Sequence, residues 1–229
     1  MCDCCGRPFA SPIAGLSAQP LCRLCRVSFY AFDRARSFAA YNPALAKAVV
    51  LLKYEEVLPL GDWFASRLAE ILRRTGDVAN EWRADVVVPV PLHADRRRER
   101  GYNQAELIAR PLAARLGIKL EPRLLIRTRP RPSRLVLSRT EHWKSVRGAY
   151  AMAGKPKIDN LRILLVDDVL TTGATLDACS RTLKRAGAAT VTCLTVGRVR
   201  SGLDATGSPR KSQLSTPSKP EGKSRASKV

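Results

Sequence analysis

The chain has 229 residues, of which 45% are hydrophobic, which is enough for one well-buried domain with small attachments. The longest apolar stretch near its beginning, residues 44–52, is interrupted by Lys47 and is far too short to span a bilayer. No segment has the pattern of a signal peptide. These features exclude membrane insertion and predict a cytoplasmic protein with reduced thiols.

The positive charge is large and widely spread. Lys and Arg number 40 against 20 Asp and Glu, a net charge of +20. Residues 201–229 hold six basic and two acidic side chains, so +16 of this charge belongs to the preceding residues. Such a surplus favours phosphate-rich partners, either nucleic acid or phosphorylated metabolites. A generally basic composition is the alternative.

The first half of the chain predicts helices around one strand. Apolar spacing of three and four indicates amphipathic helices over residues 43–53 and 60–74. A β-branched run at residues 84–91 predicts a buried strand. Residues 102–116 then predict a helix that Pro111 bends or breaks.

In the second half of the chain, the sequence again predicts strands that alternate with a helix. Apolar runs indicate strands at residues 161–166 and 190–196, and a helix over residues 174–186 that Gly187 closes lies between them. This alternation predicts an α/β fold with a mainly parallel sheet flanked by helices. Three parts are expected along the chain: a zinc-binding knuckle at 1–30, the α/β domain at 31–200, and a disordered basic tail at 201–229.

Two CxxC pairs lie near the beginning of the chain, separated by sixteen residues. Each CxxC turn presents two sulfur atoms to one metal ion, and the intervening loop can bring the pairs together. We therefore predict a structural zinc ion held by Cys2, Cys5, Cys22 and Cys25. A redox or incidental set of cysteines is one alternative. Replacement of Cys2 by Cys4 is another, because Cys2 directly follows the first methionine.

The most informative stretch is residues 161–175. Its apolar run ends in Asp167 and Asp168, and a loop of small and hydroxyl-bearing residues follows: Thr171, Thr172, Gly173, Ala174 and Thr175. Ligands of open α/β sheets bind at strand carboxyl ends, and loop amides with a helix N-terminus attract an anion. Paired carboxylates suit vicinal ribose hydroxyls, directly or through Mg²⁺. The stretch predicts a site for a ribose 5′-phosphate, with a buried strand and a Thr-rich turn as the alternative.

At these residues the chain resembles the type I phosphoribosyltransferases, whose signature VDDVxTTGAT is matched in full by residues 166–175. The resemblance implies that Asp167 and Asp168 contact the ribose hydroxyls of phosphoribosyl pyrophosphate. It also implies that residues 171–175 hold the 5′-phosphate, and that Mg²⁺ accompanies the ligand.

A second block resembles the ComF family, which is linked to bacterial competence and DNA uptake. Residues 88–92, VPVPL, lead into HADRRRERGYNQAELIA at residues 93–109, and the CxxC pairs come first, in the family's order. The resemblance covers residues 1–198. The basic loop expected after Pro91 can bind the pyrophosphate arm, because guanidinium groups such as those of Arg97 and Arg100 pair with phosphate oxygens. A solvated basic loop is the alternative.

Residues 123–150 depart from the ComF pattern. His142 stands where Arg is usual, Ser145 where Asn is usual, and Arg134 where Gln is usual. In related transferases this region forms a flexible flap over the active site. The departures leave open both the acceptor and whether catalysis is retained.

Two functional hypotheses follow. In the first, the protein binds phosphoribosyl pyrophosphate with Mg²⁺ and is a transferase whose acceptor is unidentified. In the second, it is a non-catalytic accessory factor that binds single-stranded DNA or DNA-uptake proteins, although few aromatic residues, 6%, are present to stack bases. The oligomeric state is left open.

Overall fold

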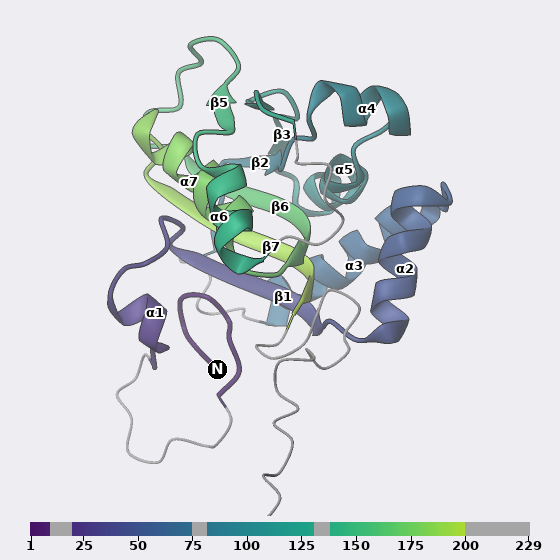
Figure 1. The fold of residues 1–229 in the computed structure, drawn as a ribbon, viewed down its shortest axis with the longest axis horizontal. Helices are drawn as coiled ribbons and strands as arrows, with labels where there is room; N and C mark the ends of the chain where they lie inside the picture. Colours follow the sequence, from purple (N-terminus) through teal and green to yellow (C-terminus); the bar gives the residue numbers. More distant parts are fainter. Residues whose placement is uncertain (10–19, 75–81, 131–137, 200–229) are drawn as a thin grey trace, which may run out of the picture.

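The architecture is a parallel sheet with helices on both faces (Figure 1). The computed structural model describes residues 1–9, 20–74, 82–130 and 138–199. The predicted α/β class is confirmed. The expected tail at 201–229 and Arg134 lie outside the described residues. None of the described helices is long and apolar enough to cross a membrane.

Five strands form the main sheet, and every neighbouring pair in it is parallel. Their order across the sheet is β1 (Arg34–Ala40), β7 (Thr190–Arg198), β6 (Arg162–Leu170), β2 (Val86–Pro89) and β3 (Lys119–Leu120). Two further strands, β4 (Leu125–Arg127) and β5 (Tyr150–Met152), pair antiparallel beside the sheet.

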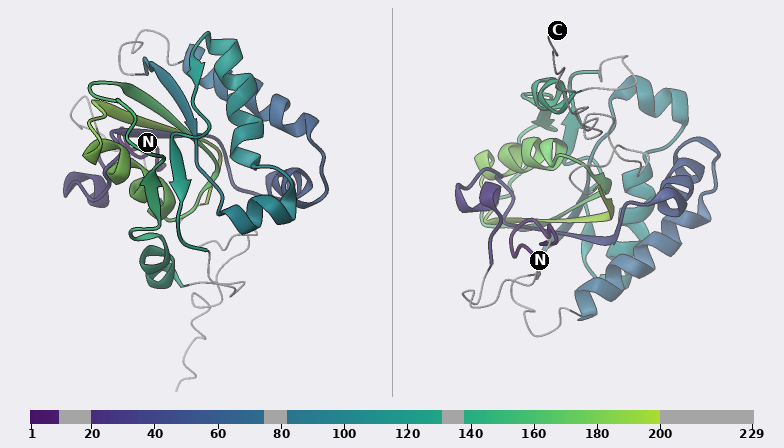
Figure 2. Two further views of the ribbon diagram at one scale, coloured as in Figure 1. Left: turned by 90° about the horizontal axis from the view of Figure 1, so that it is seen from above. Right: turned by 60° about the horizontal axis from the view of Figure 1, so that its bottom comes forward.

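The helices divide between the two faces (Figure 2). One face is covered by α2 (Pro43–Tyr54), α3 (Pro59–Arg74) and α5 (Gln104–Leu116). The other is covered by α7 (Ala174–Arg185), α6 (Arg139–Val146) and the cysteine-bearing segment with α1 (Arg23–Arg26). The short helix α4 (Ala94–Arg100) follows β2.

The middle of the sheet is buried on both sides, which explains the continuous apolar runs. In β6, Leu164 and Val166 pack with α2, α3 and α5, whereas Ile163 and Leu165 pack against the α7 side. Alternate residues of a strand point to opposite faces, and a strand covered twice therefore shows no polar alternation.

The chain reverses its winding direction between β6 and β2. From β2 it passes through α5 on one face to β3, and from β6 it passes through α7 on the other face to β7. The two connections leave neighbouring strands in opposite directions. This is a topological switch point, where open α/β sheets form a crevice at the strand carboxyl ends.

The structure has a helix or strand at each predicted position, and two details refine the prediction. Of the expected bend or break at Pro111, the break is absent, since α5 runs through this residue as one helix. Proline removes the amide that would bond to the carbonyl of Leu107, but that carbonyl is packed against α3, where a Cβ on Gly61 would lie 2.7 Å from it. Strand β6 continues past Val166 to Leu170, because its partner β7 also extends, to Arg198.

Candidate functional site

The acid pair lies within β6 rather than after it. Asp167 and Asp168 are 7% and 5% exposed, and the backbone amide of Asp168 donates to Asp167 Oδ1 at 2.9 Å. The backbone after β2 runs beside them, since the amide of Val90 donates to the carbonyl of Val166 at 2.9 Å. The pair therefore sits at the carboxyl edge of the sheet, at the switch point.

Burying two adjacent carboxylates is costly, and the pair is asymmetric. Burial and the neighbouring Asp168 raise the pKa of Asp167 well above its usual range. Burial alone would also raise the pKa of Asp168, but the ammonium of Lys53 outweighs it and the pKa of Asp168 is lowered. The negative charge of the pair is therefore concentrated on Asp168.

Lys53 is the counter-ion of this charge. It lies in the last turn of α2 and forms an ion pair with Asp168 Oδ2. Its attraction to Asp168 outweighs burial and raises the pKa of the Lys53 ammonium, so the lysine is charged. Sequence reasoning missed Lys53, because it appeared only as a polar residue at the end of an amphipathic helix.

The loop at residues 171–175, called here the TTGAT loop, leads from β6 into α7. Gly173 has a φ of 84° and precedes the first turn of α7, and the hydroxyl oxygen of Thr172 accepts from the amide of Ala174 at 3.2 Å. Thr171 is exposed, Thr172 and Thr175 are half-buried, and Gly173 and Ala174 are buried. A helix N-terminus with hydroxyls around it suits an anion.

Two side chains from distant segments contact this loop. Nδ1 of His142, on α6, lies 3.1 Å from the hydroxyl oxygen of Thr172. The hydroxyl of Tyr30 donates to the carbonyl of Thr172 at 3.1 Å. His142 was noted in the sequence only as a departure from the ComF pattern, and Tyr30 carried no signal.

The arginines after β2 lie on a helix, which corrects the predicted basic loop. Residues 94–100 form α4, because His93 caps it and pairs three residues apart, Arg96 with Glu99 and Asp95 with Arg98, support it. Arg97 is directed to Glu106 at 3.3 Å. Arg97 and Arg100, the two site residues predicted in this block, therefore have different environments: Arg97 is paired with a carboxylate, whereas Arg100 is paired with none among the described residues.

Arg100 faces a pocket. Its guanidinium donates to Gln104 Oε1 at 2.6 Å and stacks over the ring of Tyr54, 4.9 Å from the centroid. The pocket has a volume of about 160 Å³ and lies between the end of α2 and α4. Its lining residues are Lys53, Tyr54, Glu56, Arg96, Glu99, Arg100 and Tyr102. Of the two arginines predicted to bind a ligand, only Arg100 lines it.

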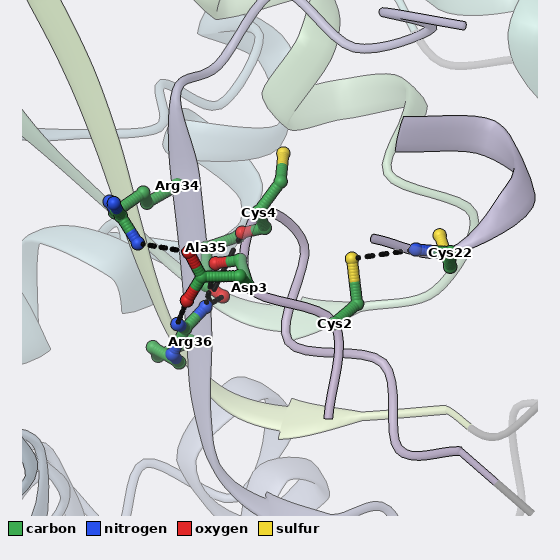
Figure 3. Close-up of polar contacts among 7 residues, drawn as sticks. All are labelled: Cys2, Asp3, Cys4, Cys22, Arg34, Ala35 and Arg36. Atoms are coloured by element: carbon green, nitrogen blue, oxygen red, sulfur yellow. Dashed lines mark hydrogen bonds and ion pairs between the residues drawn. The ribbon is translucent and has the colours of Figure 1, made fainter. Parts of the chain in front are cut away.

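The N-terminal segment forms a compact cluster of thiols. The sulfur atoms of Cys2, Cys5, Cys22 and Cys25 all lie within 4.8 Å of one another, and this set could hold a metal ion. Cys5 Sγ and Cys22 Sγ are 3.7 Å apart. In Figure 3 the sulfur of Cys4 lies apart from those of Cys2 and Cys22, but a hydrogen bond with Cys4 raises the pKa of the Cys25 thiol, so Cys4 also contacts the cluster.

This cysteine cluster is fastened to the sheet. Asp3 pairs with Arg34 at 2.9 Å and with Arg36 at 3.3 Å, both on β1 (Figure 3). The amide of Ala35 donates to the carbonyl of Cys4 at 2.7 Å. A hydrogen bond with Cys25 and burial raise the pKa of the Cys5 thiol to about 12, so without a metal ion this thiol is protonated at neutral pH.

The chain is similar to known proteins in sequence and fold. The family model of the phosphoribosyl transferase domain matches residues 102–217. DNA utilization protein YhgH of Salmonella typhi is 30% identical over 195 residues, covering 83% of this chain and 81% of that protein. Competence protein F of Haemophilus influenzae is 34% identical over 104 residues, 45% of each chain. The solved adenine phosphoribosyltransferase of Leishmania tarentolae is 16% identical, covers 69% of this chain and 79% of that one, and has a TM-score of 0.40.

The parallel sheet and the matched domain define a protein of the phosphoribosyltransferase class. The relatives narrow this class, since Competence protein ComFC of Bacillus subtilis is also similar, 26% identical over 86% of this chain and 78% of its own length. The chain belongs to the ComF family.

Proposed function

We propose that the protein binds phosphoribosyl pyrophosphate with Mg²⁺ at the carboxyl edge between β6 and β2. The ribose hydroxyls donate to Asp167 and Asp168, the 5′-phosphate occupies the TTGAT loop, and the pyrophosphate arm extends toward Arg100. The observation that carries this proposal is that one continuous segment joins a buried acid pair to an anion-attracting helix N-terminus, at the switch point of the sheet.

The arrangement is suited to transfer of a phosphoribosyl group. In that reaction the bond between C1 of the ribose and the pyrophosphate breaks, an acceptor atom bonds to C1, and pyrophosphate leaves. The transition state gains positive charge on the sugar, which the negative charge of the acid pair, concentrated on Asp168, stabilises. It also gains negative charge on the leaving group, which arginine attracts. Bound Mg²⁺ would neutralise the pyrophosphate, and carboxylates such as Asp167 and Asp168 are ligands that it accepts.

The cysteine cluster is proposed to hold a structural zinc ion. In a tetrahedral site with Zn–S bonds of about 2.3 Å the sulfurs are about 3.8 Å apart. The 3.7 Å between Cys5 Sγ and Cys22 Sγ fits this geometry. Four protein ligands leave no open position, so the ion closes the N-terminal segment and takes no part in the reaction.

Calorimetric titration with phosphoribosyl pyrophosphate and Mg²⁺ tests the binding site. We expect saturable binding that depends on Mg²⁺ and is lost when Asp167 and Asp168 are both replaced by Asn. Asp62→Asn, which removes an exposed carboxylate on α3, is the matched control and should bind as the wild type does. Absence of binding to the wild type, or equal binding by the double variant, contradicts the proposal.

Turnover is measured separately, as release of pyrophosphate in the presence of a panel of nucleophilic acceptors. Release that requires an acceptor identifies a transferase. Binding without release for any acceptor assigns a ligand-binding role in a protein linked to competence and DNA uptake, as its relatives are named.

The second candidate function is binding of single-stranded DNA in the cytoplasm as an accessory factor of DNA uptake, alone or with uptake proteins. The net charge of +20 favours it, together with relatives named for DNA utilization and competence. Fluorescence anisotropy of a labelled oligonucleotide tests it, and affinity should fall steeply with salt because phosphate contacts release counterions. No binding at low salt contradicts DNA contact.

A further inference from the structure

Lys53 takes part in two environments at once. Its ammonium forms the ion pair with Asp168, and the same side chain lines the pocket that Arg96 and Arg100 share. The side chain of Lys53 is 22% exposed, whereas that of Asp168 is 8% exposed. Lys53 therefore lies between the buried acid pair and the pocket, and its side chain contacts both.

The backbone that carries Lys53 is fixed. The hydroxyl of Tyr102 donates to the carbonyl of Leu52 at 2.6 Å, which ties the last turn of α2 to the segment after α4. A lysine side chain has four rotatable carbon–carbon bonds and a compact charge, so its ammonium can change partners without movement of the helix.

The lining of the pocket contains three cations and also the carboxylates of Glu56 and Glu99, but the cations are not all paired with them. Arg96 is paired with Glu99, but among the described residues Arg100 has no carboxylate partner and donates only to the neutral Gln104. An anionic group in the pocket would therefore meet Arg100 directly and would lie within reach of the Lys53 side chain that lines the same space.

We propose that Lys53 is a ligand-binding residue that exchanges partners, holding Asp168 in the free protein and the anionic group on C1 of the sugar in the complex. This inference rests on the proposed function. The exchange frees a carboxylate oxygen of Asp168 for a ribose hydroxyl at the moment when the ammonium gains a phosphate. It makes binding selective for a ribose with phosphate groups at both C5 and C1.

A purely structural ion pair that fastens α2 to β6 is the competing explanation. It predicts that loss of Lys53 weakens the binding of every ligand of the site equally, through the position of Asp168. The exchange predicts a selective loss, because only ligands with an anionic group on C1 use the ammonium.

The test compares phosphoribosyl pyrophosphate with ribose 5-phosphate, which lacks the group on C1, by calorimetric titration with Mg²⁺. In Lys53→Met we expect the affinity for phosphoribosyl pyrophosphate to fall at least tenfold, and the affinity for ribose 5-phosphate to change less than threefold. Lys47→Met removes an exposed charge from the same helix and should leave both affinities unchanged.

Lys53→Gln gives the same comparison if Lys53→Met fails to fold, because its amide can still donate to Asp168. An equal loss for the two ligands, or no loss for either, overturns the exchange while the proposed function survives. If the wild type binds neither ligand, the proposed function itself fails.

Discussion

The hydroxyl of Tyr30 donates a hydrogen bond of 3.1 Å to the carbonyl of Thr172, although the two residues are 142 positions apart in the chain. Tyr30 follows the second CxxC pair, and its ring lies against Gly173, where a Cβ would be only 2.7 Å from Tyr30 Cε1. The next amide, that of Ala31, donates to Asp177 on α7 at 2.8 Å. The segment that leaves the cysteine cluster thus holds the TTGAT loop in place.

Tyr30→Phe removes the hydrogen bond and keeps the ring. A hydrogen bond contributes about 1 kcal/mol, so its loss should loosen the loop and lower the affinity for ribose 5-phosphate by up to about fivefold. Ser37→Ala removes a hydrogen bond of 2.6 Å between β1 and Thr195, away from the loop. It should lower the urea midpoint without changing that affinity. Equal affinities for wild type and Tyr30→Phe contradict a positioning role.

Gly173→Ala should destabilise the loop in two ways. Its φ of 84° lies in the left-handed region, and the added Cβ meets the ring of Tyr30. Backbone strain of this kind costs about 1–3 kcal/mol. Gly148→Ala is the matched control, with a φ of 67° but nothing within 4 Å of the added Cβ. We expect a larger loss of unfolding free energy at Gly173, and a combination with Tyr30→Ala should recover the difference.

Local sequence predicted the parts of the fold that are buried on both sides. The runs in β2, β6 and β7 are apolar because both faces of these strands are covered. Strand β1, RARSFAA, has no such run and was not predicted. It forms because β7 supplies a parallel partner and Asp33 accepts from the amide of Val191 at 2.7 Å. The run of arginines predicts a basic loop at residues 94–100, whereas oppositely charged residues three positions apart stabilise the helix α4 there.

The candidate site divides in the same way. Asp167, Asp168 and the TTGAT loop are consecutive or nearly so, and their residue types indicate an anion and hydroxyl site without knowledge of the fold. Lys53 and Tyr30 reach the site from other elements. Their roles depend on how α2 and the N-terminal segment pack on the sheet, which no local pattern encodes.

Removal of metal should open the N-terminal segment. Thiols must lose protons to bind zinc, and the pKa of Cys5 is raised to about 12 without metal, so zinc affinity should fall as the pH is lowered from 8 to 6. Metal analysis should find one zinc ion per chain in the wild type and in Cys4→Ser, and less in Cys22→Ser. Undiminished zinc in Cys22→Ser contradicts the four-thiolate site.

Removal of the metal ion should also disorder the TTGAT loop, because Tyr30 connects the N-terminal segment to that loop. Treatment with a chelator should lower both the urea midpoint and the affinity for ribose 5-phosphate, and restored zinc should recover both. In Tyr30→Ala the effect of the chelator on affinity should be smaller, because the connection is already broken. An unchanged affinity in metal-free wild type would show that the loop does not depend on the cluster.

The pair of Asp85 and Arg162 joins the beginning of β2 to the beginning of β6. Asp85 accepts from the backbone amide of Arg162 at 2.8 Å and from its guanidinium at 3.1 and 2.5 Å. Hydrogen bonds from Arg162 lower the pKa of Asp85 from 3.8 to about 2. Because the folded value is the lower one, the pair stabilises the protein fully above about pH 4, and this stabilisation is lost as the pH falls toward 2.

Asp85→Asn should therefore lower the free energy of unfolding by the same amount at pH 7 and at pH 5. The pair lies at the surface, where solvent screens it, so this loss of unfolding free energy is small. Urea unfolding of metal-free wild type and variant at each pH gives the difference directly and cancels the general effect of acid. The difference should shrink below pH 4, where Asp85 becomes protonated in the unfolded chain and then in the folded one. A difference that stays constant down to pH 2 would mean that the charge of Asp85 does not contribute and that only its hydrogen bonds do.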